Sequence, residues 1–184
     1  MAHEKLPPFP ILKTASYLVR KFELGDIALV EEASKDDLIP LITSIPSLYS
    51  DDEGVSYIQR QLTRYDNGDG FSFAIAEAIE NRAIGSIYVG LKNFDEGRVS
   101  IGYWLVKSAR GKGAVSECLK AVVEWARNEL RAPRLELYVE PWNIASIKTA
   151  KSLGFSEEGL MRSWQKVGDV RKDMIMFSLI RDDE

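Results

Sequence analysis

The chain has 184 residues, of which 45% are hydrophobic, and this length is enough to bury one core of the size usual for a single domain. Its formal net charge of −4 at pH 7 provides no overall attraction for nucleic acid or an anionic membrane, so neither is expected as a partner. With Cys118 as the only cysteine and His3 as the only histidine, the sequence excludes an intrachain disulfide and argues against a zinc site or a Ser/His or Cys/His hydrolase.

The sequence contains no segment that predicts a membrane span or a signal peptide. No apolar run approaches the roughly 20 residues that cross a bilayer, and residues 1–10 lack a signal peptide's apolar core. Cys118 lies on an apolar helical face, which is typical of a buried thiol in a reducing compartment. We therefore expect a cytoplasmic protein. Residues 1–15 are expected to form a poorly ordered extension, and residues 16–184 a single domain.

The first third of the domain is expected to combine one hairpin with two helices. Residues 16–32 predict a β-hairpin that turns at Gly25-Asp26. Ser34 is suited to cap a helix that ends near Pro46, because acidic residues and then apolar residues at helical spacing follow it. Residues 52–65 predict a second helix, which ends at a loop rich in Gly, Asn and Asp.

The rest of the chain predicts a meander of strands, a long helix and a closing group of strands around a short helix. Residues 113–130 carry apolar side chains every three or four positions, which predicts a long helix with one buried stripe. The other elements are expected as strands at residues 71–79, 83–91, 98–106, 134–140, 155–161 and 171–180, and a short helix at 144–152.

A loop with two glycines joins the third of these strands to the long helix. Gly111 and Gly113 let several backbone N–H groups point the same way, and the helix N-terminus adds unpaired donors and partial positive charge. Arg110 and Lys112 add two cations, so the loop favours a diphosphate ligand. Its spelling fits neither a P-loop nor a dinucleotide-binding loop. The alternative is that both glycines only shape a strand-to-helix turn.

A second informative segment surrounds the short helix. Asn143 can cap this helix and Gly154 can end it, and capping alone would explain both residues. Ser146 falls in the first helical turn, where an ordinary exposed or capping hydroxyl is the alternative to a catalytic one. Trp142 and Trp164 are candidates for the wall of an acceptor cleft, or else for the core.

Together the two segments resemble the GNAT superfamily of N-acetyltransferases, and the order of elements over residues 16–180 agrees with that family's fold. The motifs that resemble its RimJ/RimL branch, which acetylates ribosomal-protein N-termini, are Gly102-Tyr103-Trp104-Leu105, Arg110-Gly111-Lys112-Gly113, Asn143-x-x-Ser146 and Gly154-Phe155. The resemblance implies an α/β (α+β) fold, with a mixed, mostly antiparallel central sheet that splays in the middle and is flanked by about four helices.

The resemblance also implies acetyl-CoA as cosubstrate, without a metal. The pantetheine arm would enter between the strand that ends at Val106 and the strand at 134–140, and would pair with strand backbone. The residues expected to hold the cosubstrate are Leu105 and Val106 through backbone contacts, the loop Arg110, Gly111, Lys112, Gly113, Ala114 and Val115 at the pyrophosphate, and Asn143 and Ser146 near the cleft.

The sequence departs from the family pattern at two positions. Val115 occupies the last small-residue position of the loop, which puts the loop's approach to phosphate in doubt. Ala150 stands where other branches carry a tyrosine, the proposed acid for the departing thiolate. RimL-like relatives carry a serine at the position of Ser146, and this hydroxyl is expected to donate a hydrogen bond to the thiolate or to hold a water.

The expected reaction is direct attack of an amine on the thioester, with the oxyanion held by a strand N–H, that of Val106 or a neighbour. A base must deprotonate the ammonium form of the acceptor. Related enzymes carry a base at the position of Tyr138, and Glu136 and Glu140 share its strand face, although all three could form a solvated face. We take Ser146, Tyr138 and Glu140 as the candidate catalytic residues.

Three alternatives for function remain open at this stage. The acceptor is a protein N-terminus, as the resemblance suggests, or a small amine such as a polyamine, an amino acid or an antibiotic. A non-catalytic acyl-CoA sensor is the third alternative, motivated by the tyrosine missing at Ala150. Neither the acceptor nor the choice between monomer and homodimer follows from the sequence.

Overall fold

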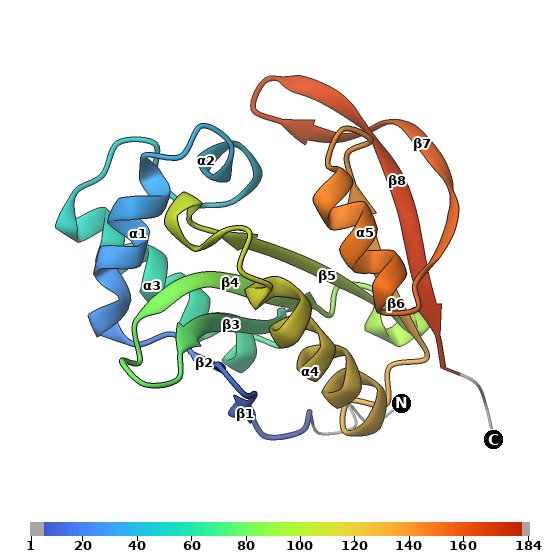
Figure 1. The fold of residues 1–184 in the computed structure, drawn as a ribbon, viewed down its shortest axis with the longest axis horizontal. Coiled ribbons are helices and arrows are strands. Elements are labelled where there is room, and N and C mark those ends of the chain that lie inside the picture. Colours follow the sequence, from blue (N-terminus) through green and yellow to red (C-terminus); the bar gives the residue numbers. More distant parts are fainter. Residues whose placement is uncertain (1–5, 182–184) are drawn as a thin grey trace.

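The computed structural model describes residues 6–181 and is built on one eight-stranded sheet (Figure 1). The spatial order of strands is β1-β2-β3-β4-β5-β6-β8-β7, and every neighbouring pair is antiparallel except β5 and β6. The strands are β1 (Leu12–Lys13), β2 (Tyr17–Lys21), β3 (Gly70–Glu77), β4 (Ala83–Gly90), β5 (Arg98–Leu105), β6 (Arg134–Val139), β7 (Ser156–Val167) and β8 (Val170–Ile180). This confirms the expected mixed, mostly antiparallel sheet.

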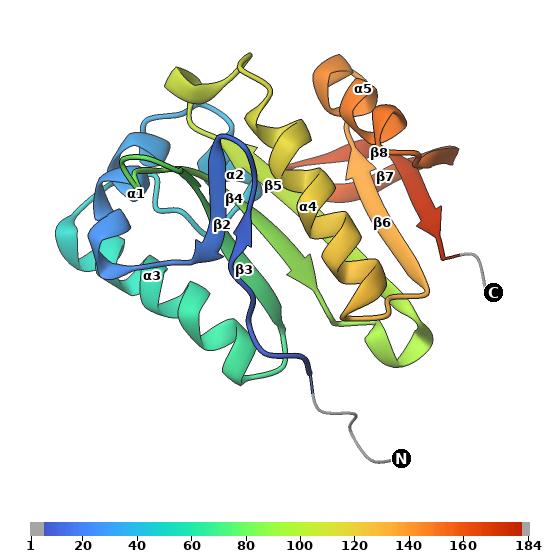
Figure 2. The same ribbon diagram turned by 60° about the horizontal axis from the view of Figure 1, so that its bottom comes forward.

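Helices cover both faces of this sheet. Phe71 and Ser72 point to opposite faces because they are consecutive in β3, and Trp125 of α4 packs on Phe71 while Gln61 of α3 bonds to Ser72. Helices α4 and α5 lie on the same side of the sheet (Figures 1 and 2). The helices are α1 (Ile27–Ser34), α2 (Ile39–Ile42), α3 (Asp51–Asp66), α4 (Ala114–Asn128) and α5 (Ile144–Ser152), with single 3₁₀ turns η1 (Leu24–Asp26), η2 (Phe94–Glu96) and η3 (Lys107–Ala109).

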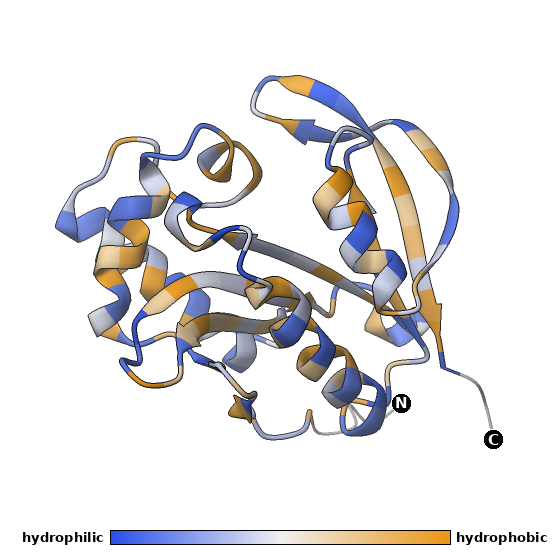
Figure 3. Ribbon diagram, viewed as in Figure 1, coloured by the Kyte–Doolittle hydropathy of each residue, from blue (hydrophilic) through white to orange (hydrophobic). Residues whose placement is uncertain are grey.

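The core lies between the sheet and the helices, as the apolar periodicity predicts. Strands β3 and β4 are mainly hydrophobic, whereas α4 mixes hydrophobic and hydrophilic residues (Figure 3). The buried residues of α4 form one stripe, Ala114, Cys118, Leu119, Val122, Val123, Trp125 and Ala126. Burial raises the pKa of the Cys118 thiol to about 12, so this thiol stays protonated at neutral pH. None of the helices in the described residues is long and apolar enough to span a membrane.

The N-terminal segment is more structured than expected where the structure describes it. Phe9 packs on the rings of Phe71 and Phe73, with centroids 5.4 and 4.7 Å apart, and β1 pairs with β2. An aromatic side chain that reaches the core offsets the entropy of ordering the segment. His3 lies outside the described residues.

The hairpin expected over residues 16–32 is wrong. Only β2 is a strand, and the chain then turns through η1 into α1, where Leu29, Val30 and Ala33 are buried at helical spacing. Asp26 does not form a hairpin turn, because its carboxylate is buried against the Arg20 guanidinium, with both N···O distances 2.9 Å, and accepts the Glu23 N–H.

The helix expected to start at Ser34 is also wrong. Ser34 is the last residue of α1, and its hydroxyl donates to the Glu31 carbonyl. The short α2 follows instead, and the Asp36 carboxylate accepts the N–H groups of Leu38 and of Ile39, the first residue of α2. The remaining predicted elements are confirmed, except that β7 and β8 form a longer hairpin that also includes most of residues 162–170.

Strands β5 and β6 separate halfway along their length, as the resemblance implies. Their parallel pairing runs only from Arg98 opposite Arg134 to Ile101 opposite Leu137. Beyond it, β5 continues to pair with β4 through Leu105, and β6 with β8 through Val139. The facing edges of β5 and β6 are therefore free of each other beyond these paired residues.

Candidate active site

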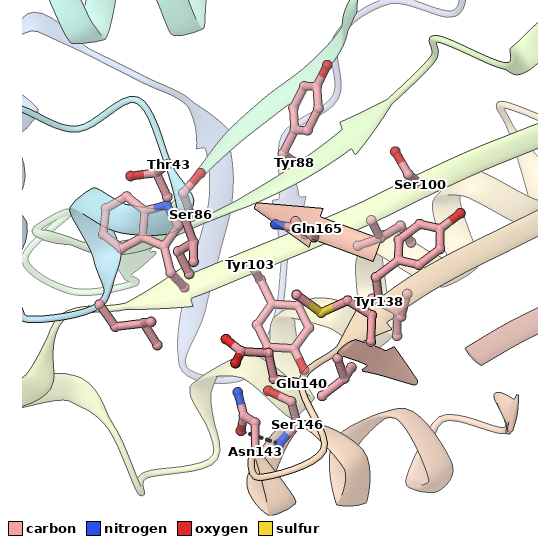
Figure 4. Close-up of a pocket in the computed structure, with 18 of the residues that line it drawn as sticks. Thr43, Ser86, Tyr88, Ser100, Tyr103, Tyr138, Glu140, Asn143, Ser146 and Gln165 are labelled. Carbon is pink, nitrogen blue, oxygen red and sulfur yellow. Dashed lines mark hydrogen bonds between the residues drawn. The ribbon is translucent and has the colours of Figure 1, made fainter. Parts of the chain in front are cut away.

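A cavity of about 430 Å³ lies at this separation of β5 and β6. It is lined from β4, β5, β6, α3 and the N-terminal turn of α5, and most of the labelled side chains in Figure 4 are polar. Of the expected site residues, Tyr138, Glu140, Asn143 and Ser146 line this cavity. The loop from Arg110 to Val115, which joins the end of β5 to the start of α4, is not among the lining residues.

A row of unbonded N–H groups begins at the glycine loop. Gly111 and Gly113 have left-handed φ angles of 77° and 80°, which glycine adopts without strain. Within the described residues, the N–H groups of residues 111–116 donate to no protein acceptor, and the first bond of α4 is from Glu117 N–H to the Gly113 carbonyl. This arrangement fits an oxygen-rich anion such as a diphosphate.

Val115, the valine at the loop's last small-residue position, places its side chain against the hydrophobic core. Its side chain is half-buried and packs against the hydrophobic core, while Ala114 before it is buried. The valine therefore does not need space on the open side of the loop.

Arg110 ties the loop to its surroundings and does not present a free cation. Its Nε donates to the Leu105 carbonyl at 3.0 Å, and its guanidinium pairs with the Asp36 carboxylate at 2.6 Å. Burial alone would raise the pKa of Asp36, but N–H donors from Leu38 and Ile39 together with Arg110 hold that pKa below its ordinary value. The free charge expected beside a diphosphate is therefore that of exposed Lys112, which makes no ion pair with any described residue.

The oxyanion donor was expected to be the N–H of Val106 or of a neighbour, and the structure favours the neighbour. The Val106 N–H donates to the Ile84 carbonyl at 3.1 Å. Because alternate residues of a strand bond to opposite sides, the N–H of Leu105 faces the gap instead. Leu105 is the neighbour that can donate there, although its carbonyl is occupied by Arg110.

Two hydroxyl groups meet at the α5 end of the cavity. The Asn143 side chain accepts the Ser146 N–H at 3.1 Å, so Asn143 caps α5 and fixes its first turn. The Tyr103 hydroxyl points towards Ser146 (Figure 4), is buried, and has no partner in hydrogen-bonding geometry among the described residues. Burial raises the pKa of Tyr103. Sequence reasoning missed Tyr103 as a site residue, because a tyrosine within an apolar strand is typical of a core side chain.

On the opposite strand, Tyr138 is held as a hydrogen-bond donor. Its hydroxyl donates to the Glu136 carboxylate at 2.6 Å, and that carboxylate is only 2% exposed and pairs with Arg134. Burial and the Glu136 hydrogen bond raise the pKa of Tyr138 to about 12, so the phenol stays protonated at neutral pH. The face is therefore not simply solvated, and Tyr138 in this state is no base.

Glu140, directly after β6, is the carboxylate that reaches the cavity. One of its oxygens accepts the Trp142 indole N–H at 2.8 Å, and both residues line the cavity. Trp164 stacks on Tyr138 with centroids 5.8 Å apart. Trp142 and Trp164 are 59% and 50% exposed, so neither belongs to the core.

The hairpin of β7 and β8 covers one side of the cavity. Its tip reaches α2, where the Gly168 N–H donates to the Leu41 carbonyl at 3.2 Å, and Figure 1 shows this hairpin extending towards α2. Gln165 and Met174 of the hairpin line the cavity. Among residues 6–181, no group of three or more His, Cys, Asp or Glu side chains could hold a metal ion.

Comparisons with known proteins agree with this geometry. Residues 17–156 match the acetyltransferase (GNAT) domain family. An uncharacterised N-acetyltransferase from Bacillus licheniformis, p20, is 30% identical over 172 residues, which cover 92% of this chain and 96% of that protein.

Two solved structures share the fold at lower identity. The complex of RimL, a ribosomal L7/L12 α-N-protein acetyltransferase, with coenzyme A has a TM-score of 0.76 and 20% identity, covering 93% of this chain and 98% of that one. The ribosomal-protein-S5-alanine acetyltransferase from Vibrio fischeri has a TM-score of 0.77 and 18% identity, covering 95% and 98%.

Proposed function

Since the chain belongs to the GNAT acetyltransferase family and is an acetyl-CoA-dependent N-acetyltransferase, we propose that its acceptor is the α-amino group of a protein N-terminus. The observation that carries this proposal is the cavity where β5 and β6 separate, which the β7–β8 hairpin covers on one side. The hydrogen bond from Gly168 to Leu41 joins the β7–β8 hairpin to α2 beside the cavity, and a hairpin held there favours the end of an extended chain over an internal segment. The ribosomal-protein acetyltransferases among the structural neighbours support the same acceptor class.

The chain's own groups suit the two parts of the cosubstrate. The N–H groups of residues 111–116 and the Lys112 ammonium would hold the diphosphate. The free edge of β5 beyond Ile101 would pair with the amides of the pantetheine arm, as an added strand does. When bound, acetyl-CoA supplies the acetyl group as a thioester. Asn143 keeps the first turn of α5 in place beside this edge.

Different residues around the cavity are suited to accept the acceptor's proton, to stabilise the oxyanion and to donate to the departing sulfur. Glu140 is placed to accept the proton of the acceptor ammonium, because it is the carboxylate that lines the cavity. The Leu105 N–H faces the gap, where negative charge develops on the attacked carbonyl oxygen. Ser146 and Tyr103 provide the hydroxyl donors for the departing sulfur. Tyr138 acts as a wall and donor, not as the base.

The direct test is turnover on a matched panel of acceptors. The purified protein is incubated with acetyl-CoA and with N-terminal peptides, the same peptides with a blocked α-amino group but a free lysine, polyamines and free amino acids. Free thiol release measures turnover, and mass spectrometry locates the acetyl group. We expect acetylation at the α-amino group of peptides. Turnover on small amines alone would reject the peptide acceptor, and coenzyme A binding without turnover on any amine would indicate a sensor.

A further inference from the structure

Arg64 of α3 is a cation at the wall of the cavity, and within residues 6–181 its guanidinium has no hydrogen-bonding or ionic partner. It lines the cavity, and its side chain makes no hydrogen bond or ion pair with any residue in 6–181. Its Nε atom is buried, and a buried donor without an acceptor costs free energy that folding normally avoids. An acceptor atom supplied by a bound ligand would remove this cost.

The guanidinium of Arg64 is held in place by stacking. Its central carbon lies 4.6 Å from the centroid of the Tyr88 ring. The Tyr88 hydroxyl in turn donates to the Asp69 carbonyl at 2.8 Å, which fixes the ring. A guanidinium that rests on an aromatic face keeps its N–H edge free for a planar carboxylate, and its position is set before a ligand arrives.

The cavity has one charge of each sign, and the two lie at opposite ends. Among the described residues that line it, Arg64 is the one lysine or arginine and Glu140 the one carboxylate. Tyr88, whose ring stacks with the Arg64 guanidinium, lies on the far side of the cavity from Glu140 and Ser146 (Figure 4). Tyr88 is paired with Gly102, three residues before Leu105, so the register places Tyr88, on whose ring Arg64 rests, about 10 Å along the sheet from the proposed transfer point.

We propose that Arg64 binds a carboxylate of the acceptor, about 10 Å from the amine that is acetylated, a distance of three residues in an extended chain. The inference rests on the proposed function and names its substrate class, an N-terminal segment with an acidic side chain at the second to fourth residue. The ammonium faces Glu140 and the carboxylate faces Arg64, so the charge pattern of the cavity matches that of the acceptor.

The test measures acceptor binding without turnover. Peptides with an N-terminal serine and a glutamate at position two, three or four are titrated calorimetrically into the protein saturated with coenzyme A, alongside the matching glutamine peptides. We expect at least one glutamate peptide to bind about ten- to hundredfold more tightly than its glutamine counterpart. Arg64→Gln is expected to remove this preference, and Arg64→Lys to retain part of it. Arg127→Gln, on α4 outside the cavity, is the matched loss of one arginine and is expected to keep the preference.

Each outcome decides a separate statement. Equal binding of glutamate and glutamine peptides to the unchanged protein, or a preference that survives in Arg64→Gln, overturns the carboxylate site. A preference that depends on Arg64 without acetylation of any peptide keeps the site and rejects the proposed function. The last ligand to be titrated is a linear ω-amino acid whose amine and carboxylate are about as far apart as the α-amine and the glutamate carboxylate of the peptides. If it alone binds in an Arg64-dependent way, the carboxylate belongs to a small acceptor, and the peptide class is rejected.

Discussion

Tyr138 lies in β6 and Glu140 directly after it, and their hydrogen bonds predict different roles. We expect Glu140→Gln to lower kcat/KM at neutral pH by about 10²–10⁴, the usual contribution of a general base. The loss should shrink at higher pH, where the acceptor amine is already neutral. Tyr138→Phe should cost less and leave the pH profile unchanged, because the phenol, with a pKa of about 12, is protonated throughout. Equal losses and parallel pH profiles for the two variants would contradict this assignment.

Tyr103 offers a test that separates function from stability. Its buried hydroxyl has no partner in hydrogen-bonding geometry within residues 6–181, so Tyr103→Phe should leave the free energy of unfolding unchanged or raise it by up to about 1 kcal/mol. The same variant should lower kcat, because the hydroxyl faces Ser146 at the proposed position of the departing sulfur. Denaturant unfolding and steady-state kinetics on one preparation measure both effects. A destabilised variant with unchanged kcat would show that the hydroxyl serves the fold.

At the scale of elements, the glycine loop sets how closely a ligand approaches α4. Gly113→Ala places a methyl group where no protein atom lies within 4 Å, so its cost to the fold comes from the φ of 80° and should be about 1 kcal/mol. The methyl group instead meets the space proposed for the diphosphate. We expect the KM for acetyl-CoA to rise about tenfold or more, while the KM for the acceptor stays unchanged.

Gly25→Ala is the matched control for this loop. It also has open space around it, it lies in η1 away from the loop, and its φ is not in the left-handed region. It should change neither the stability by more than about 0.5 kcal/mol nor the KM for acetyl-CoA. If both variants behave alike, the loop does not hold the diphosphate.

The elements also show which parts of the structure can be predicted from the sequence. Strong periodicity predicted α3, α4, α5 and the strands of the meander, and the motif predicted where β5 and β6 separate. Residues 16–42 could not be predicted, because the buried pair of Arg20 and Asp26 joins residues that local pattern assigns to a hairpin turn. Arg64 and Tyr103 were missed for a similar reason. Their lack of partners is a property of the assembled cavity, and no spacing in the sequence records it.

At the scale of the whole molecule, the two parts of the sheet are joined by few strand pairs. Only the four pairs from Arg98 opposite Arg134 to Ile101 opposite Leu137 connect β5 to β6, and the hydrogen bond from Gly168 to Leu41 joins the β7–β8 hairpin to α2. A ligand whose amides pair with the free edge of β5 would add contacts at the junction between these two parts of the sheet. Binding to the native state alone stabilises it by mass action.

Coenzyme A should therefore raise both the melting temperature and the local protection of this junction. At about 100 times Kd, the gain is about 2.7 kcal/mol, which for a chain of this length corresponds to a rise in Tm of about 5–10 °C. Hydrogen exchange should slow at Tyr103 and Leu105, the alternate β5 residues whose N–H groups face away from β4, and at residues 111–116, and should remain unchanged in β3. Slower exchange spread evenly over the sheet, without extra protection at these two segments, would place the ligand elsewhere. The two measurements together thus test the position of the cosubstrate independently of any acceptor.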